Sequence, residues 1–298
     1  MHAIIFDFDG TIADGFSPSP NNIGIHEIHR IVIRQMFGDS ALTFFEESLG
    51  GLQNREPSEL IHLLLGGDDR DALDKFISLK MDYFLPEISP FWPRLSSGFK
   101  ELWMEIAEGT IPVETAIVSS GHDAFIKKVF ETNGLPTPKI LITSDTTKNL
   151  GEPNGRRPLH KPHSHMLARA HYDLIKDAIW EDHEAWISAE DRYTGRNLWK
   201  GNIMYVGDDP SKDLVLAGNA RIIGGFVPFS NKEFQPDLQK GQVLIPSFHW
   251  LSAHLHEHKD DFARGKSMAE IMLGISDKEL FPPSPRLERE FATRQERW

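Results

Sequence analysis

The feature that most constrains this chain is a short apolar run at its N-terminus that ends at two aspartates. Residues 3–6 (Ala-Ile-Ile-Phe) are long enough for a buried strand and too short for a helix. Asp7, Phe8, Asp9 and Gly10 follow directly. Because side chains alternate along a strand, the carboxylates of Asp7 and Asp9 point to the same face if the extended geometry continues. Gly10 then lets the chain turn away from the strand direction. Two acids at the carboxyl end of a buried strand predict a ligand site in an open α/β sheet.

Three other interpretations of this stretch compete with a chemical site. An Asp-Gly pair after an apolar run can form a hairpin turn, but Pro18 and Pro20 leave no room for a matching strand. A calcium loop needs a third oxygen ligand before its glycine and a glutamate further along, and neither is present. A solvated strand end without function is the third alternative. The polar segments elsewhere in the chain distinguish between these possibilities.

The length, net charge and composition of the sequence limit the partners and the chemistry that the protein can have. A chain of 298 residues suits one large domain with an insert, or two domains. A net charge of −12 argues against a broad nucleic-acid surface, because such surfaces are basic. The absence of cysteine excludes disulfides, thiolate metal sites and cysteine nucleophiles. No segment reaches the ~20 apolar residues of a membrane span, and no secretory leader is present. We therefore expect a cytoplasmic protein that binds neither nucleic acid nor membrane.

Helical periodicity dominates the segment from residue 23 to about residue 88, where apolar residues recur every three or four positions. Gly66 and Gly67 predict the end of one helix, and Asp68 or Asp69 predicts the N-cap of the next. The turn-rich segment 12–22 leads into this region, and three prolines at positions 86, 90 and 93 end it. We expect residues 16–96 to form an inserted helical cap.

After residue 97, short apolar runs alternate with helical patterns, the first of which Ser96 or Ser97 is expected to cap. This alternation predicts an α/β fold with a doubly wound parallel sheet, a Rossmann-type core built from residues 1–15 and 97–256. Residues 164–200 carry a longer helical pattern than a crossover needs. The charged segment 257–298 could pack against the body or serve a partner, and by default we expect it to be a solvated helical extension. The predicted strands after the first are residues 113–118, 139–143, 202–206, 221–227 and 242–245.

Polar groups stand at the end of several predicted strands or beside a predicted helix. Each has a structural explanation as an N-cap, a helix entrance or a turn. Together they place four carboxylates near one sheet edge, where the charges repel and raise one another's pKa. A divalent cation or a lysine is then expected to hold the charge, and hard oxygen ligands suit Mg²⁺. These groups are Asp7 and Asp9; Ser119, Ser120 and Gly121; Lys161; and Asp208, Asp209 and Asp213.

In order and spacing these segments resemble the four motifs of the haloacid dehalogenase-like superfamily, mostly phosphatases and phosphotransferases. Residues 7–11 (Asp-Phe-Asp-Gly-Thr) resemble the first motif and residues 115–121 the second. Lys161-Pro162 resembles the third and residues 206–213 the fourth. The helical insert resembles the cap of the phosphoglucomutase-like and phosphonatase-like branch. The segment between Lys161 and Asp208 is longer than the plain pattern, and residues 257–298 have no counterpart in it.

The resemblance implies a role for each matching residue. Asp7 would attack phosphorus and form an aspartyl phosphate, and Asp9 would act as general acid and then as general base. Ser119 would bind the phosphoryl oxygens, and Lys161 would neutralise their charge. An acid at position 9 favours phosphorus chemistry, because dehalogenase members lack one there. The implied Mg²⁺ ligands are Asp7, the backbone carbonyl of Asp9, and Asp208, with Asp209 or Asp213 in support. The other supporting residues of the site are Ser120, Gly121, Gly10 and Thr11.

The expected function is that of a Mg²⁺-dependent phosphatase acting on a small phosphorylated metabolite. A phosphotransferase or mutase on the same site is the nearest alternative. A phosphonatase would need an amine in the cap, and neither Lys75 nor Lys80 stands out from a solvated helix face. A binding module without catalysis is the alternative from another class. Arg55, in a segment that resembles the substrate-specificity loop of capped relatives, is expected to contact the leaving group, unless it only pairs with Glu56 or Glu59.

A histidine-rich segment near the C-terminus, His254-x-His256-x-His258, lies on a predicted helix. Because a period of two scatters side chains around a helix, we do not expect a metal site there.

Overall fold

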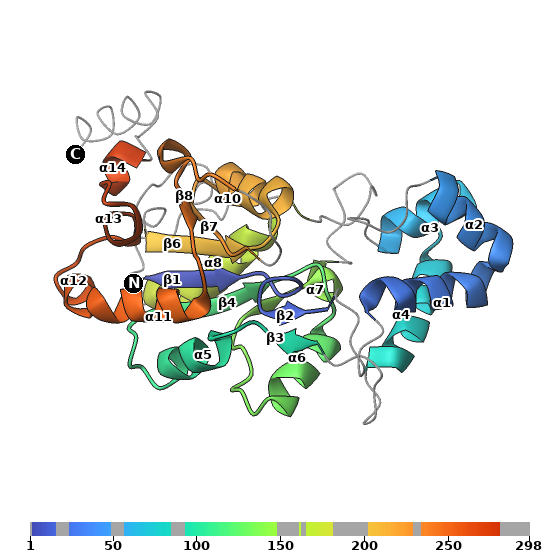
Figure 1. Cartoon of the computed structure of the whole chain (residues 1–298), viewed down its shortest axis with the longest axis horizontal. Coiled ribbons are helices and arrows are strands. Elements are labelled where there is room, and N and C mark those ends of the chain that lie inside the picture. Colours follow the sequence, from blue (N-terminus) through green and yellow to red (C-terminus); the bar gives the residue numbers. More distant parts are fainter. Residues whose placement is uncertain are drawn as a thin grey trace.

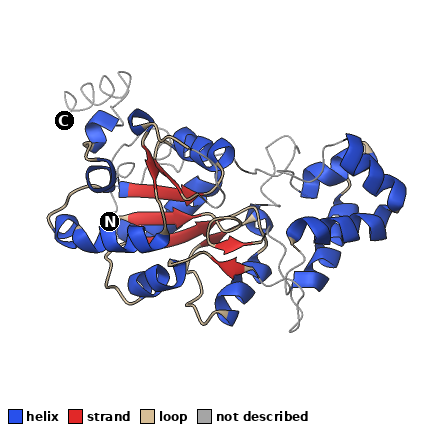
Figure 2. Ribbon diagram, viewed as in Figure 1, coloured by secondary structure: helices blue, strands red, loops and turns tan. Residues whose placement is uncertain are grey.

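A sheet of six parallel strands forms the centre of the protein (Figures 1 and 2). The computed structural model describes residues 2–15, 24–48, 57–84, 93–147, 161, 165–180, 202–228 and 234–280. The sheet has the order β5-β4-β1-β6-β7-β8, so the predicted doubly wound α/β fold is confirmed. Its strands are β1 (Ala3–Phe6), β4 (Glu114–Val118), β5 (Leu141–Ile142), β6 (Ile203–Gly207), β7 (Ile223–Phe226) and β8 (Gln242–Leu244).

Strand β1 is buried on both faces because its side chains alternate between two layers of helices. Ile4 and Phe6 belong to the larger apolar cluster, and the Phe6 ring lies 5.7 Å from Phe99 and 6.0 Å from Phe248. Ile5 belongs to the second cluster on the other face. A strand that is covered on both faces has an unbroken run of apolar residues in its sequence, and residues 3–6 form such a run. The first layer includes α5 (Phe99–Ala107), α6 (Asp123–Thr132) and α11 (Phe248–Glu257), and the second α8 (His165–Trp180) and α10 (Val215–Ala220).

The strand order reverses at β1, which pairs with β4 on one side and with β6 on the other. The ladder continues one residue beyond β1, since the Asp7 N–H donates to the Val206 carbonyl over 2.8 Å. In an open parallel sheet, a crevice forms at the carboxyl ends of the strands where the order reverses. The fold therefore directs the segments after β1, β4 and β6 toward a common place.

Four helices lie between β2 (Ala13–Asp14) and β3 (Arg94–Leu95) in the sequence and are grouped at one end of the molecule (Figure 1). As predicted, α3 ends at Leu65 before the glycine pair, and the Asp69 carboxylate accepts the Ala72 N–H (2.9 Å) at the start of α4. Phe84 at the end of α4 stacks on Phe125 of α6, with ring centroids 4.5 Å apart. The proposed boundaries of the cap at 16 and 96 stay a prediction. The helices are α1 (Ile25–Phe37), α2 (Asp39–Ser48), α3 (Pro57–Leu65) and α4 (Arg70–Phe84).

A two-stranded antiparallel sheet joins the segments that lead into and out of the four helices, and it was not predicted from the sequence. Its strands are β2 (Ala13–Asp14) and β3 (Arg94–Leu95). Ser96 reinforces it, because its N–H donates to the Ile12 carbonyl (2.8 Å) and its hydroxyl to the Thr11 carbonyl. The prediction that a serine caps α5 was therefore wrong. The N-cap residue is Gly98, which makes no side-chain cap.

The described part of the C-terminal segment packs against the body of the protein, so the expectation of a solvated helix was wrong for residues 257–280. Phe262, Met268 and Ile271 are buried and belong to the larger apolar cluster. His2, directly before β1, donates through Nε2 to the Lys266 carbonyl (2.8 Å). The segment contains α12 (Lys259–Ala263), α13 (Met268–Leu273) and α14 (Asp277–Leu280). Among the described helices, none combines the length and apolar character needed to cross a bilayer.

Candidate active site

Three carboxylates and one ammonium group meet at the carboxyl ends of β1 and β6. Lys161 Nζ lies 2.6 Å from Asp7 Oδ1 and 3.2 Å from Asp213 Oδ1. One oxygen from each of Asp7, Asp208 and Asp213 lies within 4.8 Å of the others. We call these three aspartates the Asp cluster. The side chains of Asp7, Asp213 and Lys161 are 10%, 2% and 4% exposed, so their charges interact with little screening by water.

The electrostatics of the Asp cluster leave negative charge uncompensated. Burial raises the pKa of the Asp7 carboxyl well above its ordinary value, and the carboxylates of Asp213 and Asp208 act in the same direction, against Lys161. Burial lowers the pKa of Lys161, but contact with Asp213 and Asp7 outweighs burial and raises it. Lys161 therefore stays protonated. The repulsion among the carboxylates is what a bound cation would relieve.

Gly10 and Thr11 hold Asp208 in place from the loop after β1. Gly10 has φ +81°, and a Cβ atom there would lie 2.5 Å from Asp208 Oδ2. The buried Thr11 donates its hydroxyl hydrogen to Asp208 Oδ1 over 3.3 Å. The loop itself closes on the Phe8 carbonyl, which accepts the backbone N–H groups of Ile12 (2.9 Å) and Ala13 (3.0 Å). The glycine is therefore needed both for its backbone conformation and for the close approach of a carboxylate.

The carboxylate of Asp9 lies close to the loop after β4. A Cβ atom on Gly121 would lie 3.2 Å from both Asp9 Oδ2 and Ser119 Oγ. Ser119 is fully buried, and its Oγ accepts the Gly121 N–H over 2.9 Å. The Ser120 carbonyl accepts the hydroxyl of Ser144 (2.8 Å), which ties this loop to the segment after β5. The second predicted strand end therefore joins the first.

Asp209 and Asp213, two alternatives for a supporting acid, have different surroundings. Asp213 is 1% exposed and accepts the Asp209 N–H (3.0 Å) as well as the Lys161 ammonium. A Cβ atom on Gly207 would collide with its carboxylate. The Asp209 carboxylate instead accepts the N–H (2.8 Å) and hydroxyl (2.6 Å) of Ser211 as the N-cap of the π-helical turn Pro210–Leu214. The geometry favours Asp213 as the supporting acid.

No protein-family model matches the sequence, and no curated protein matches it. Solved structures match it in fold. A complex of an Asp-to-Asn variant of CbbY from Rhodobacter sphaeroides with xylulose-1,5-bisphosphate has a TM-score of 0.51 and 16% identity, covering 83% of this chain and 94% of that one. A haloacid dehalogenase-like hydrolase from Bacteroides fragilis has a TM-score of 0.50 and 18% identity, with coverages of 84% and 99%. A HAD hydrolase of family IA, variant 3, from Entamoeba histolytica has a TM-score of 0.50 and 14% identity, with coverages of 86% and 100%.

The chain has the haloacid dehalogenase-like fold. At these identities the likeness concerns the architecture alone, and it assigns no role to the residues at the site. In this haloacid dehalogenase-like core, the segments that resemble the first, second and fourth motifs all lie at the same sheet edge. Lys161 joins them, while its neighbour Pro162 and the cap residue Arg55 lie outside the described residues. The role of Arg55 therefore stays a prediction.

Tyr205, which contacts two members of the site from within β6, was not predicted from the sequence. Its buried hydroxyl lies 3.3 Å from Asp213 Oδ1 and 3.2 Å from the Val118 carbonyl, and can donate its one hydrogen to either. The Lys161 Nζ lies 5.3 Å from the centre of its ring. Burial and then Asp213 raise the pKa of the hydroxyl, which keeps it a donor. A tyrosine inside an otherwise apolar run, three residues before Asp208, was the available signal.

His122 was also missed, and it holds the loop after β4 against the segment after β5. It is 3% exposed, and its Nδ1 lies 3.2 Å from Asp145 Oδ1. The other oxygen of Asp145 accepts the Asp123 N–H over 3.0 Å. This network fixes the position of the loop that carries Ser119. Its signal in the sequence was weak, because one histidine after a glycine is common in turns.

The donor set of the Asp cluster fits Mg²⁺. Asp7, Asp208 and Asp213 supply carboxylate oxygens, the ligands that Mg²⁺ prefers, and Asp208 is half-buried, so the cluster is open to solvent on its side. The three carboxylates exceed the single ammonium group of Lys161 in charge. A divalent cation would therefore be held by charge as well as by ligand type.

Proposed function

We propose that this chain is a Mg²⁺-dependent phosphatase that hydrolyses a small phosphomonoester through a phosphorylated Asp7. The observation that carries the proposal is the buried contact of 2.6 Å between Asp7 and Lys161, beside Asp208 and Asp213. A nucleophilic carboxylate, an ammonium group and a cation site side by side suit phosphoryl transfer, which depends on positioning and charge. Structures of CbbY, which shares the fold, hold phosphate or xylulose-1,5-bisphosphate, and they support a phosphorylated small molecule as substrate.

In the first step, an Asp7 oxygen attacks phosphorus as the bond between phosphorus and the leaving oxygen breaks. Asp9 donates its proton to that leaving oxygen, so the product departs as an alcohol. Lys161 is close enough to Asp7 to neutralise charge on the phosphoryl oxygens. Because Ser119 Oγ accepts the Gly121 N–H, its own hydrogen is left to donate to a phosphoryl oxygen.

In the second step, water attacks the phosphorus of the aspartyl phosphate, and the acyl phosphate bond breaks. Asp9, now ionised, takes the proton from the water, and inorganic phosphate and the Asp7 carboxylate are restored. The position of Asp9 near Gly121 and Ser119, beside the loop that would hold the phosphoryl group, supports both of its roles.

Mg²⁺ would be held by Asp7, Asp208 and the backbone carbonyl of Asp9, with Asp213 in support. When bound, it neutralises charge that develops on the phosphoryl group. The residues of the chain then have the remaining tasks of attack, proton transfer and orientation.

A screen of phosphorylated metabolites for release of inorganic phosphate tests the proposal. We expect turnover with Mg²⁺, loss of turnover in excess chelator and inhibition by Ca²⁺, which accepts looser coordination than in-line transfer allows. Full activity in excess chelator contradicts the role of the cation. Transfer of the phosphoryl group to a second sugar, with little phosphate release, supports a mutase instead. Asp7→Asn is the control for contaminating phosphatases.

A further inference from the structure

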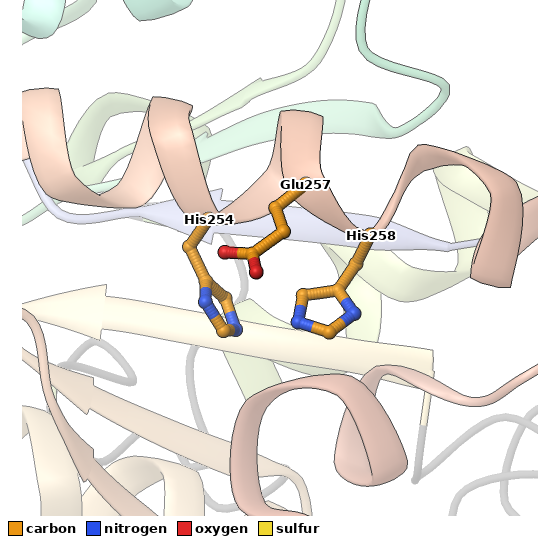
Figure 3. A group of neighbouring side chains, drawn as sticks. All are labelled: His254, Glu257 and His258. Carbon is orange, nitrogen blue, oxygen red and sulfur yellow. The ribbon is translucent and has the colours of Figure 1, made fainter.

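A second group of metal-ligating side chains lies at the end of α11, outside the active site. One ligand atom from each of His254, Glu257 and His258 lies within 4.8 Å of the others. We call these three residues the His cluster. Figure 3 shows the two imidazoles on one side of the helix with the Glu257 carboxylate beside them. The ring centroids of the two histidines are 4.6 Å apart.

The His cluster corrects the expectation that these histidines scatter around the helix. His256 does point elsewhere, because its Nε2 pairs with Glu105 Oε1 over 3.3 Å. His254 and His258, however, are four residues apart, and residues three and four apart share a helix face. Glu257 is three residues from His254 and adjacent to His258, so it completes the set. The relevant pattern is H-x-x-E-H rather than the alternation of histidines.

Both imidazole rings are held in fixed orientations by neighbouring groups. His258 Nδ1 lies 2.7 Å from Asp261 Oδ2, and donation of its hydrogen to this carboxylate leaves the Nε2 lone pair for a metal. The His254 ring stacks on Trp250, with centroids 4.9 Å apart, and its Nε2 donates to the Ile271 carbonyl over 3.2 Å. Carboxylate and carbonyl partners of this kind orient the histidines of metal sites.

Asp261 is itself fixed as a charged partner for His258. Hydrogen bonds from His258, Arg264 and Lys266 hold the pKa of its carboxyl well below its ordinary value. The carboxylate therefore stays ionised and keeps accepting the hydrogen of His258 Nδ1. The orientation of one ligand is built into the junction between α11 and α12.

We infer that the His cluster binds a divalent transition-metal ion, with Zn²⁺ as the best match. Two imidazoles and a carboxylate are a common protein ligand set for Zn²⁺, and water supplies the fourth ligand. Imidazole nitrogens favour such ions over Mg²⁺, which prefers oxygen ligands. His254 and His258 are half-buried and Glu257 is exposed, so an ion can reach the site from solvent. The metal would stabilise the junction from which the C-terminal helices continue.

The site lies away from the Asp cluster. His2, at the amino end of β1, contacts Phe262 and Lys266 of the segment that follows the His cluster. Figure 1 shows the junction of α11 and α12 beside that end of β1, whereas Asp7 follows its other end. The two clusters therefore occupy opposite edges of the sheet, and binding at each is measured separately.

Titration of the full chain with ZnCl₂ in excess Mg²⁺, followed by calorimetry, tests the inference. Excess Mg²⁺ competes for the oxygen ligands of the Asp cluster, so we expect one Zn²⁺ per chain to be retained at the His cluster. His254→Ala and His258→Ala should each weaken binding at least tenfold. His256→Ala is the matched control, because it removes a histidine of the same helix that faces away, and it should bind as the wild type does. Circular dichroism establishes that each variant is folded.

Co²⁺ gives a second readout that does not depend on enzyme activity. Bound at a tetrahedral nitrogen and oxygen site, it absorbs visible light strongly, and His254→Ala should lose this absorbance. Equal Zn²⁺ affinity in the wild type and His254→Ala, or an equal loss in His256→Ala, overturns the inference. Zn²⁺ binding that disappears entirely in excess Mg²⁺ also overturns it, since it places the ion at the carboxylates.

Discussion

The Asp cluster and the His cluster differ in how the chain brings their members together. Asp7 and Asp208 come from the ends of two strands far apart in sequence, and they meet because β1 and β6 are neighbours in the sheet. The members of the His cluster come from the last turn of α11 and its C-cap residue, His258. The first arrangement exists only in the complete fold, whereas the second requires little more than a helix and the contact with Asp261.

The two clusters also differ in their cost to stability. The Asp cluster buries charges of one sign, and Lys161 compensates for only part of them. Such groups favour ligand binding at the expense of the free protein. The His cluster is half-exposed and contains a single carboxylate, so it stores little repulsion between like charges. Substitutions in the Asp cluster should therefore change both activity and stability, whereas substitutions in the His cluster should leave the activity measured with Mg²⁺ unchanged.

The largest expected effect is the loss of activity in Asp7→Asn. The amide is a poor nucleophile, so turnover of the preferred phosphomonoester should fall below about a hundredth of the wild-type value. This loss corresponds to an increase of about 2.7 kcal/mol in the activation free energy. Steady-state kinetics with Mg²⁺ measure the loss, and circular dichroism checks the fold. Retained activity in a folded variant would remove Asp7 from the role of nucleophile.

The same substitution should make the metal-free protein more stable at neutral pH. Because the pKa of Asp7 is raised in the folded state, that state binds the proton more tightly than the unfolded chain does. Stability of the wild type in chelator should therefore fall as pH rises above about 3.9, the ordinary pKa of an aspartate, and through the folded value. The free energy of unfolding of Asp7→Asn should fall by less than that of the wild type over this pH interval. Denaturant melts from pH 4.5 to 7.5 give the comparison, and parallel curves contradict it.

Gly10→Ala should have the next largest effect, because it moves Asp208 without removing any carboxylate. The added Cβ would lie 2.5 Å from Asp208 Oδ2 in a backbone conformation with φ +81°. The backbone alone should cost about 1–2 kcal/mol of stability. Displacement of the Asp208 carboxylate should lower kcat/KM at least tenfold, which corresponds to about 1.4 kcal/mol of transition-state stabilisation. It should also raise the Mg²⁺ concentration needed for activity.

Gly134→Ala is the control for this prediction, since Gly134 has φ +64° and nothing lies within 4 Å of its added Cβ. It should lose a similar amount of stability, as measured by thermal melts, and keep its activity. Equal kcat/KM values for the two variants would show that the contact of Gly10 with Asp208 has no part in catalysis.

The Asp cluster was the more predictable of the two because each of its members ends a recognisable pattern. Apolar runs interrupted by Asp7 and Asp208 are visible in the sequence, and the rule that parallel strands end at one edge places them together. The choice between Asp209 and Asp213 was not predictable, since it depends on the turn that Asp209 caps. The pairing of β2 with β3 was also missed, because strands of two residues carry no periodicity.

The His cluster and the C-terminal segment were mispredicted for a different reason. The alternation of histidines was considered without the four-residue spacing that it contains, although that spacing determines which side chains meet on a helix. Residues 257–280 looked solvated because charged residues outnumber the apolar ones in sequence. Burial depends on where Phe262 and Met268 fall around short helices, and on the contact with His2, which only the fold provides.

A smaller effect is expected from Tyr205→Phe, which keeps the ring and removes one hydroxyl. Asp213 would lose a donor at 3.3 Å and keep the Lys161 contact at 3.2 Å. A buried hydrogen bond contributes about 0.5–1.5 kcal/mol, so kcat should fall about three- to tenfold. Tyr83→Phe is the control, because its hydroxyl accepts from Gln35 Nε2 between α4 and α1. A loss in Tyr83→Phe as large as in Tyr205→Phe would contradict a role specific to the Asp cluster.

The smallest effect is expected from His254→Ala, the variant that removes the His cluster. Its side chain contacts Trp250, His258 and the Ile271 carbonyl, none of which belongs to the Asp cluster. With Mg²⁺ and no Zn²⁺, kcat/KM should stay within about twofold of the wild type, a difference of ~0.4 kcal/mol. The same assay on His256→Ala supplies the baseline for loss of a histidine from α11. A larger loss in His254→Ala alone would show that the two clusters are coupled through β1, and would end the claim that the chain carries two independent sites.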